Sequence, residues 1–135
     1  MAELDEIPGI QVQKCHSSID RHSYYMSVFT CEPEAFGGLT RDQVVTALKA
    51  EAIPAFRMYP RIQDTAHFTS VKSTTRHTDH PCPISRHLAD HGIWLHHRIL
   101  LADESLITQT IEAFKRIARY GPDIKRAFSN STHPL

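Results

Sequence analysis

The chain has 135 residues and carries fifteen basic and fifteen acidic side chains, so its formal net charge is zero. This balance provides no electrostatic surface for nucleic acid or an anionic membrane, and no apolar stretch approaches the roughly 20 residues of a membrane-spanning helix. A chain of this length buries roughly two thirds of its unfolded surface, which is enough for one core. We therefore expect a single domain over residues 1–135, with a lead-in over 1–21, a core over 22–120 and a flexible tail over 121–135.

The cysteines and the N-terminus indicate the compartment. Cys15, Cys31 and Cys82 are odd in number and far apart in the sequence, which is typical of reduced thiols and not of a disulfide framework. The first ten residues begin with acidic side chains and lack the basic and apolar regions of a signal peptide. Both observations favour a cytoplasmic protein.

The first twenty residues predict a helix end, a short strand and a loop. Residues 2–6 are typical of the end of a helix whose first turns precede the chain. Ile10 and Val12 predict a short strand. Residues 14–20 are polar and predict a loop that leads into the core.

Residues 22–60 predict the unit around which the rest of the chain is organised. The run Tyr24–Phe29 is apolar at both parities, which favours a central strand with both faces buried. Thr40 and Gln43 have the spacing of a helix capping box, in which each side chain satisfies a backbone N–H of the other residue. Pro54 then ends the helix, and an extended segment follows. The apolar face of this helix comprises Val44, Val45, Leu48 and Ala52.

The middle of the chain has weaker local signals. Residues 61–69 show no clear period, and the polar tract Ser70–Asp79 predicts a mobile surface loop. Pro83 suits the first turn of a helix, for which Cys82 is a poor cap. Gly92 is placed to end that helix in the left-handed conformation.

The last third predicts a strand and a long helix. A strand from Ile93 places Trp94 and His96 on the face opposite Ile93 and Leu95. Asp103 caps the helix that follows. Its apolar stripe comprises Ile107, Ile111, Phe114 and Ala118. The order of elements predicts an α+β or split β-α-β fold, in which helices cover one face of a small sheet of three to four strands.

Six blocks of the sequence, taken in order, point to a known family. They are LxxIPGI, YYMSVFT, FGGLTRDQVVTALKAEAIPA, YPRIQDTAHF, CPISRHLADHGIWLHHRILLADE and IEAFKRI. Their order and spacing resemble the C-terminal small domain of the DegT/DnrJ/StrS-type sugar aminotransferases, which are pyridoxal-phosphate enzymes of fold type I. The resemblance covers most of residues 4–118. It is greatest to the branch of amino-hydroxybenzoate synthases and scyllo-inosose aminotransferases.

The resemblance implies that pyridoxal phosphate is the cofactor of the full-length enzyme and that a large N-terminal domain holds the lysine that binds it. None of the lysines in this chain has the apolar setting that favours imine chemistry. They are Lys14, Lys49, Lys72, Lys115 and Lys125. We therefore predict that this chain holds no cofactor, provides no catalytic residue and is not a transaminase by itself. Its expected partners are the large domain, in cis or in trans, and further copies of itself.

The resemblance also implies that the segment after Pro54 lines the substrate side of the cleft. The family pattern there has an aromatic residue before a proline, matched by Tyr59 and Pro60, and a final aromatic residue, matched by Phe68. Gln63 stands where the family usually has His or Tyr, so the substrate is left open.

Further candidates for substrate contact have structural alternatives. Arg57 suits bidentate binding of a carboxylate and equally suits an ordinary surface position. Tyr59 suits either a pocket wall or a packed anchor. His96 and His97 fall in a block that enters near the cleft in the family, and the alternative is that they are hydrogen-bonded structural residues. Ala52 stands where the family usually has a helix-ending glycine.

A zinc site can be drawn from the histidines, but the pattern does not favour one. His87 and His91 are one helical turn apart, with Cys82, His96 and His97 nearby in sequence. The last two are predicted to point to opposite faces of a strand, and the chain has no CxxC or HExxH pattern. We therefore predict no metal. The alternatives to an aminotransferase fragment are a freestanding ligand-binding or interaction module without catalysis and a zinc-stabilised regulatory domain.

Overall fold

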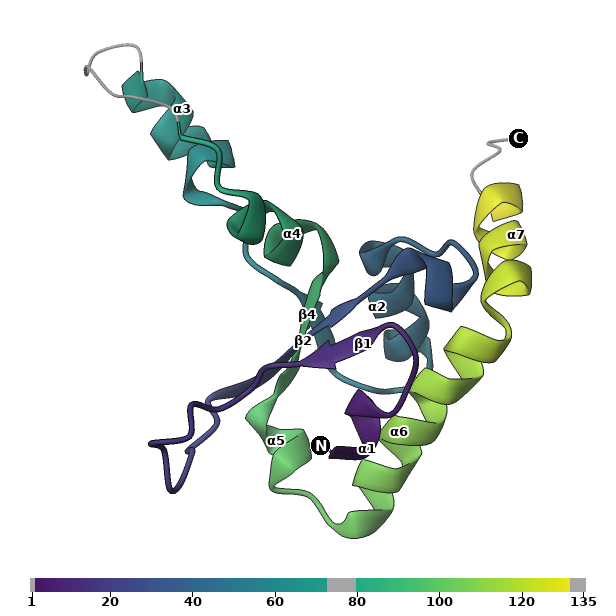
Figure 1. Ribbon diagram of the computed structural model, residues 1–135. Helices are drawn as coiled ribbons and strands as arrows, with labels where there is room; N and C mark the ends of the chain where they lie inside the picture. The colour runs from purple at the N-terminus through teal and green to yellow at the C-terminus, as the bar shows by residue number, and fades with distance from the viewer. Residues whose placement is uncertain (1, 73–79, 132–135) are drawn as a thin grey trace.

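The computed structural model describes residues 2–72 and 80–131. Its centre is a four-stranded antiparallel sheet in the order β1-β2-β4-β3 (Figure 1). The strands are β1 (Ile10–Val12), β2 (Met26–Cys31), β3 (Ala55–Arg57) and β4 (Gly92–His96). β2 and β3 are both antiparallel to β4, which lies between them, so they are parallel to each other. With the intervening helix they form the predicted split β-α-β arrangement.

Seven α-helices and two short 3-10 helices surround the sheet in the described ranges. The α-helices are α1 (Ala2–Asp5), α2 (Arg41–Ala50), α3 (Ala66–Lys72), α4 (Pro83–His91), α5 (His97–Leu100), α6 (Glu104–Arg119) and α7 (Gly121–Ser131). The 3-10 helices are η1 (Pro33–Phe36) and η2 (Ile62–Asp64). α3 projects away from the sheet at the end of an arm that begins with α4 (Figure 1).

One face of the sheet and the helices α2 and α6 enclose the core. The side chains of Phe29, Ile93 and Leu95 are at most 1% exposed on this face. The ring of Phe29 meets the ring of Phe114 in α6 edge to face, with their centroids 5.2 Å apart. This layer confirms most of the predicted apolar stripes: α2 buries Val44, Val45 and Leu48, and α6 buries Ile111 and Phe114, with Ile107 and Ala118 partly buried. Ala52 is exposed, so its place on the apolar face was predicted wrongly.

The opposite face of the sheet is covered at one corner by α4. Thr30 lies between Phe29 and Cys31 in β2 and therefore points away from the core. Side chains of α4, including His87 and Leu88, border a hollow with Thr30 and its neighbours in β1 and β2. The prediction that helices cover one face holds for α2 and α6, whereas α4 lies on the other face.

The ends of α2 follow local sequence signals. Thr40 accepts a hydrogen bond from the Gln43 backbone N–H (3.3 Å), and the Gln43 side chain accepts one from the Thr40 N–H (2.9 Å), so the predicted capping box is confirmed. At the other end, Ile53 N–H donates to the Leu48 carbonyl and Ala52 N–H donates to the Lys49 carbonyl. This is a Schellman motif. It places Ala52 in the left-handed region, with φ 62°.

Gly92 does not form the predicted left-handed cap. Its φ is −73° and its ψ is 132°, because it is already the first residue of β4. Close packing is what requires glycine here. A Cβ atom at this position would lie 2.3 Å from the Leu88 carbonyl oxygen and 2.7 Å from Met58 Cβ.

Three further sequence predictions need correction. The central strand begins at Met26, so Tyr24 and Tyr25 precede it, and Tyr25 is 76% exposed. The segment without a clear period contains η2 and α3, and residues 70–72 of the predicted loop lie in α3. The remainder of the predicted loop, 73–79, lies outside the described residues.

Residues 121–131 of the predicted flexible tail form the helix α7, and residues 132–135 lie outside the described residues. Gly121 fits directly against η1, where a Cβ atom would lie 2.3 Å from the Phe36 carbonyl oxygen. Ile124 and Phe128 of α7 pack against the core. Gly121, Ile124 and Phe128 thus hold α7 against the rest of the fold, although the local sequence predicts a frayed segment.

None of the helices in the described part of the chain is long and apolar enough to cross a membrane. Cys15, Cys31 and Cys82 are free thiols. Cys15 is exposed and Cys31 is buried in the core.

Candidate functional site

An open groove of about 630 Å³ lies between α2 and the edge strand β3. Lys49 of α2 forms one side, and Arg57 and Tyr59 lie in and just after β3 on the other. Phe56 and Trp94 also line it. The groove therefore combines residues that are up to 52 positions apart in the sequence, from Asp42 to Trp94, and the pairing of β3 with β4 joins them.

Two stacked aromatic rings form part of this groove. Phe56 and Trp94 are direct partners in the β3–β4 register, and their ring centroids are 4.3 Å apart at an interplanar angle of 17°. Trp94 Nε1 donates a hydrogen bond to the Arg57 carbonyl oxygen (3.1 Å). The ammonium of Lys49 lies 5.2 Å from the centroid of the Phe56 ring. These contacts fix an aromatic surface beside two cationic side chains.

The charges in the groove are unevenly paired. Asp42 is engaged by Arg41, whereas neither Arg57 nor Lys49 forms an ion pair with any residue in the described ranges. Arg57 and Lys49 are both exposed to solvent. A guanidinium and an aromatic surface that line one groove suit a ligand that carries a carboxylate on an apolar or aromatic body.

Tyr59 lies on the rim of the groove and is 61% exposed. It is therefore not a packed anchor, and Pro60 next to it also lines the groove. Arg57 and Tyr59 are the two predicted substrate residues that the fold brings together. Their contact with a substrate stays a prediction.

Gln63 and Phe68 lie on the arm and do not line the groove. Gln63 is in η2, and its Nε2 lies 3.5 Å from the sulfur of Cys82, with which it forms a weak hydrogen bond. Phe68 is half-buried in α3. The family pattern that joins these residues to Tyr59 therefore spans two separate parts of this structure.

His96 and His97 lie at the far end of β4 and do not point to opposite faces of a strand. β4 ends at His96 and α5 begins at His97, and the centroids of the two imidazole rings lie 4.1 Å apart. The ring nitrogen Nδ1 of His96 accepts a hydrogen bond from Arg98 N–H (3.2 Å) and so caps α5. Tyr25 stacks on His97 with a centroid distance of 6.4 Å.

The sequence does not single out Lys49, Phe56 or Trp94 as residues of a site, and the structure places all three in the groove. The alternation in residues 93–96 does place Trp94 opposite the core. Only the β3–β4 register shows that Phe56 shares that face.

The described lysines lack the buried, apolar setting that lowers an ammonium pKa for imine formation. The four whose side chains the structure describes are all exposed: Lys14, Lys49, Lys115 and Lys125. The hydrogen bond from Lys115 to Glu112 (2.9 Å) raises the pKa of that lysine, which is the opposite of what imine chemistry needs.

The fold is an α+β domain with an open groove beside its edge strand. The chain belongs to the DegT/DnrJ/EryC1/StrS aminotransferase family, whose pattern matches residues 1–114. This agrees with the resemblance seen in the sequence blocks.

Individual relatives agree with this assignment. The chain is 29% identical over 133 aligned residues to a putative L-glutamine:3-amino-2,3-dideoxy-scyllo-inosose aminotransferase of Streptomyces kanamyceticus, covering 86% of this chain and 31% of the relative. It is 31% identical over 115 residues to the 3-amino-5-hydroxybenzoate synthase of Amycolatopsis mediterranei strain S699, covering 81% and 28%. The crystal structure of 3-amino-5-hydroxybenzoic acid synthase matches with a TM-score of 0.65 at 27% identity, covering 87% of this chain and 30% of that one. The chain thus spans about 30% of the length of these relatives.

Proposed function

We propose that this chain is the C-terminal small-domain part of a pyridoxal-phosphate-dependent aminotransferase and provides a carboxylate-binding groove on the substrate side of the active site. The observation that carries the proposal is that Arg57, which has no ion-pair partner among the described residues, lines the same groove as the stacked rings of Phe56 and Trp94. A larger domain, in cis or in trans, holds the cofactor lysine. The cofactor supplies the electron sink for amino-group transfer there.

The chemistry of the relatives supports a carboxylate ligand. L-Glutamine, named as the amino donor of one relative, and 3-amino-5-hydroxybenzoate, named as the product of another, both carry a carboxylate. Arg57 binds that group through two N–H donors, and Lys49 adds a second positive charge. Tyr59 provides a wall for the rest of the ligand. The proposed site includes four further residues if the larger domain also contacts the arm and the end of β4. These residues are Gln63, Phe68, His96 and His97.

An apolar hollow on the surface of the chain is a second observation in favour of a large partner domain. It lies between α2, α6 and α7 and has a volume of about 460 Å³. Ala47, Ala50, Ile117, Ile124 and Phe128 are among its lining residues. Burial of such a surface against the larger domain, and against further copies of the chain in a cytoplasmic homo-oligomer, is part of the same proposal.

Titration with benzoate and with L-glutamine, followed by amide NMR shifts of the chain, tests the groove. We expect shifts centred on Lys49, Phe56, Arg57 and Trp94. Arg57→Ala is expected to weaken binding at least about tenfold and Arg57→Lys less, because lysine keeps the charge but loses the bidentate fork. Arg98→Ala is the matched control, since Arg98 is exposed on α5, away from the groove. Shifts elsewhere, or equal weakening in the control, would contradict the proposal.

Incubation with pyridoxal phosphate tests whether the cofactor binds to this chain or requires the larger domain. We expect that no imine absorbance survives dialysis of the chain, because its described lysines are exposed. Absorbance that persists and disappears in Lys49→Ala would instead make this chain a cofactor-binding unit.

A further inference from the structure

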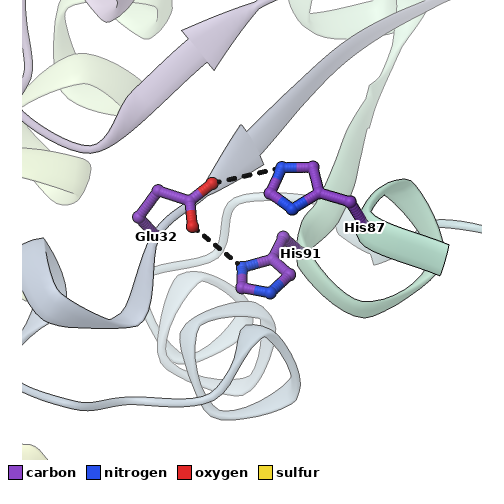
Figure 2. Close-up of side chains that lie close together, drawn as sticks. All are labelled: Glu32, His87 and His91. Carbon is purple, nitrogen blue, oxygen red and sulfur yellow. Dashed lines mark ion pairs between the residues drawn. The ribbon is translucent and has the colours of Figure 1, made fainter. Parts of the chain in front are cut away.

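We propose that Glu32, His87 and His91 form a binding site for a divalent transition-metal ion, with zinc as the best match, which fastens α4 to the end of β2. The three side chains converge from two elements that are 55 residues apart in the sequence (Figure 2). Among the described residues, this is the one group in which three His, Cys, Asp or Glu side chains could hold a metal ion. It lies apart from the groove and does not depend on the proposed aminotransferase role.

The distances are those of donors that share one ion. His87 Nε2 lies 3.3 Å from Glu32 Oε1, and His91 Nδ1 lies 3.2 Å from Glu32 Oε2. Two donors bound to a tetrahedral zinc at about 2.0–2.1 Å are about 3.3 Å apart. The three ligand atoms all lie within 4.8 Å of one another, so small side-chain rotations bring them onto one ion.

The backbone holds the three residues firmly. His87 and His91 are four residues apart in α4, and their rings stack with centroids 4.6 Å apart. Arg41 fixes the end of α4 by donating from Nη1 to the carbonyl oxygens of Ala89 (2.8 Å) and Gly92 (3.3 Å). Glu32 directly follows β2, and its N–H donates to the Gly9 carbonyl (2.8 Å).

A buried imidazole nitrogen provides a second, independent observation. His91 Nδ1 is shielded from solvent and has no hydrogen-bond partner in the described part of the chain, although Glu32 Oε2 lies 3.2 Å away. The approach has the distance of a hydrogen bond without its geometry. A buried ring nitrogen without a partner is costly. A metal ion on its lone pair would satisfy it.

The donor set selects the class of metal. Two imidazoles and one carboxylate suit zinc, with a water molecule as a fourth ligand, and other late divalent metals such as cobalt and nickel. Magnesium and calcium prefer sites made wholly of oxygen. The His87 side chain is 44% exposed, so the fourth position is open to solvent. The ion would connect the base of the arm to the sheet.

Zinc titration by calorimetry on the untagged chain tests the site. We expect one ion per chain, and an affinity reduced at least about tenfold in each of Glu32→Gln, His87→Ala and His91→Ala, because each removes a direct ligand. His67→Ala is the matched control, since His67 is an exposed helical histidine of the same arm. It is expected to leave the affinity unchanged.

Two further measurements distinguish loss of metal binding from loss of folding: the absorption spectrum with cobalt and the melting temperature with and without zinc. A tetrahedral cobalt spectrum and a rise in melting temperature on adding zinc are expected for the chain and for the His67→Ala control, and not for the three ligand variants. Circular dichroism without metal verifies that each variant is folded. Absence of zinc binding to the chain, which an ordinary Glu–His ion pair predicts, overturns the proposal, as does an affinity that the three variants do not change.

Discussion

The indole N–H of Trp94 donates a hydrogen bond to the backbone carbonyl of Arg57 across 3.1 Å. The bond joins β4, which lies within the sheet, to β3 at its edge. It thereby fixes the backbone that carries the Arg57 guanidinium.

Trp94→Phe tests this link. The variant keeps an aromatic ring on Phe56 but removes the N–H donor and part of the stacked area. We expect the free energy of unfolding, measured in urea, to fall by about 1–2 kcal/mol. Tyr120→Phe serves as the control, because Tyr120 is 48% exposed and removal of its hydroxyl is expected to change stability by less than about 0.5 kcal/mol. Equal stability of the two variants would show that the bond contributes nothing.

Ala52→Gly is expected to stabilise the chain. Ala52 has φ 62°, a conformation that costs an L-residue about 1–2 kcal/mol, while glycine adopts it without steric strain and loses more entropy on folding. The net gain in unfolding free energy is expected to be about 0.5–1 kcal/mol in urea denaturation.

The matched control for that change is Ala50→Gly, two residues earlier. Ala50 is the last residue of α2 and is helical. Glycine there is expected to lower the unfolding free energy by about 0.5–1 kcal/mol. If both changes destabilise the chain, the left-handed position is not strained.

Gly121→Ala is expected to loosen α7. The new methyl group would lie 2.3 Å from the Phe36 carbonyl oxygen, so α7 or η1 must shift. We expect a loss of about 1–3 kcal/mol in unfolding free energy and faster amide exchange throughout α7. Asn130→Ala, at an exposed position of the same helix, is expected to leave both unchanged. Slow exchange in the Gly121 variant would mean that α7 docks without this contact.

Cys31 is expected to make the free energy of unfolding fall as the pH rises through the alkaline range. Burial, with a smaller contribution from the nearby Glu32 carboxylate, raises the pKa of the Cys31 thiol from 9.0 to about 12. The folded state therefore favours the neutral thiol. Its contribution to stability is complete below pH 9 and is lost as the pH rises towards 12.

The difference in unfolding free energy between the chain and Cys31→Ala measures this contribution. Between pH 8 and pH 10.5 the difference is expected to shift by about 2 kcal/mol in favour of the variant, which has no thiol to ionise. In the folded chain, exposed Cys15 is expected to react with iodoacetamide much faster than Cys31. Identical pH slopes for the two proteins would contradict the raised pKa.

Local signals predicted much of the secondary structure. The Thr40–Gln43 capping box, the Asp103 cap and the apolar stripe of α6 were found where the sequence placed them, and so was that of α2 except for Ala52, which is exposed beyond the helix end. Gly92 misled prediction because a glycine after a helix usually marks a left-handed cap. Here its lack of a side chain serves the contact with Met58, which is distant in sequence.

The sequence by itself determined the α+β class, the ends of two helices and the family, because hydrogen bonding and apolar periodicity within a few residues express these directly. Only the tertiary structure decided that β4 lies between β2 and β3, that Lys49 and Arg57 border one groove, and that Glu32 meets two histidines of α4. Those relationships depend on strand register and on helix placement over the sheet. Both are set by the sum of many contacts between distant residues, which no short stretch of sequence contains.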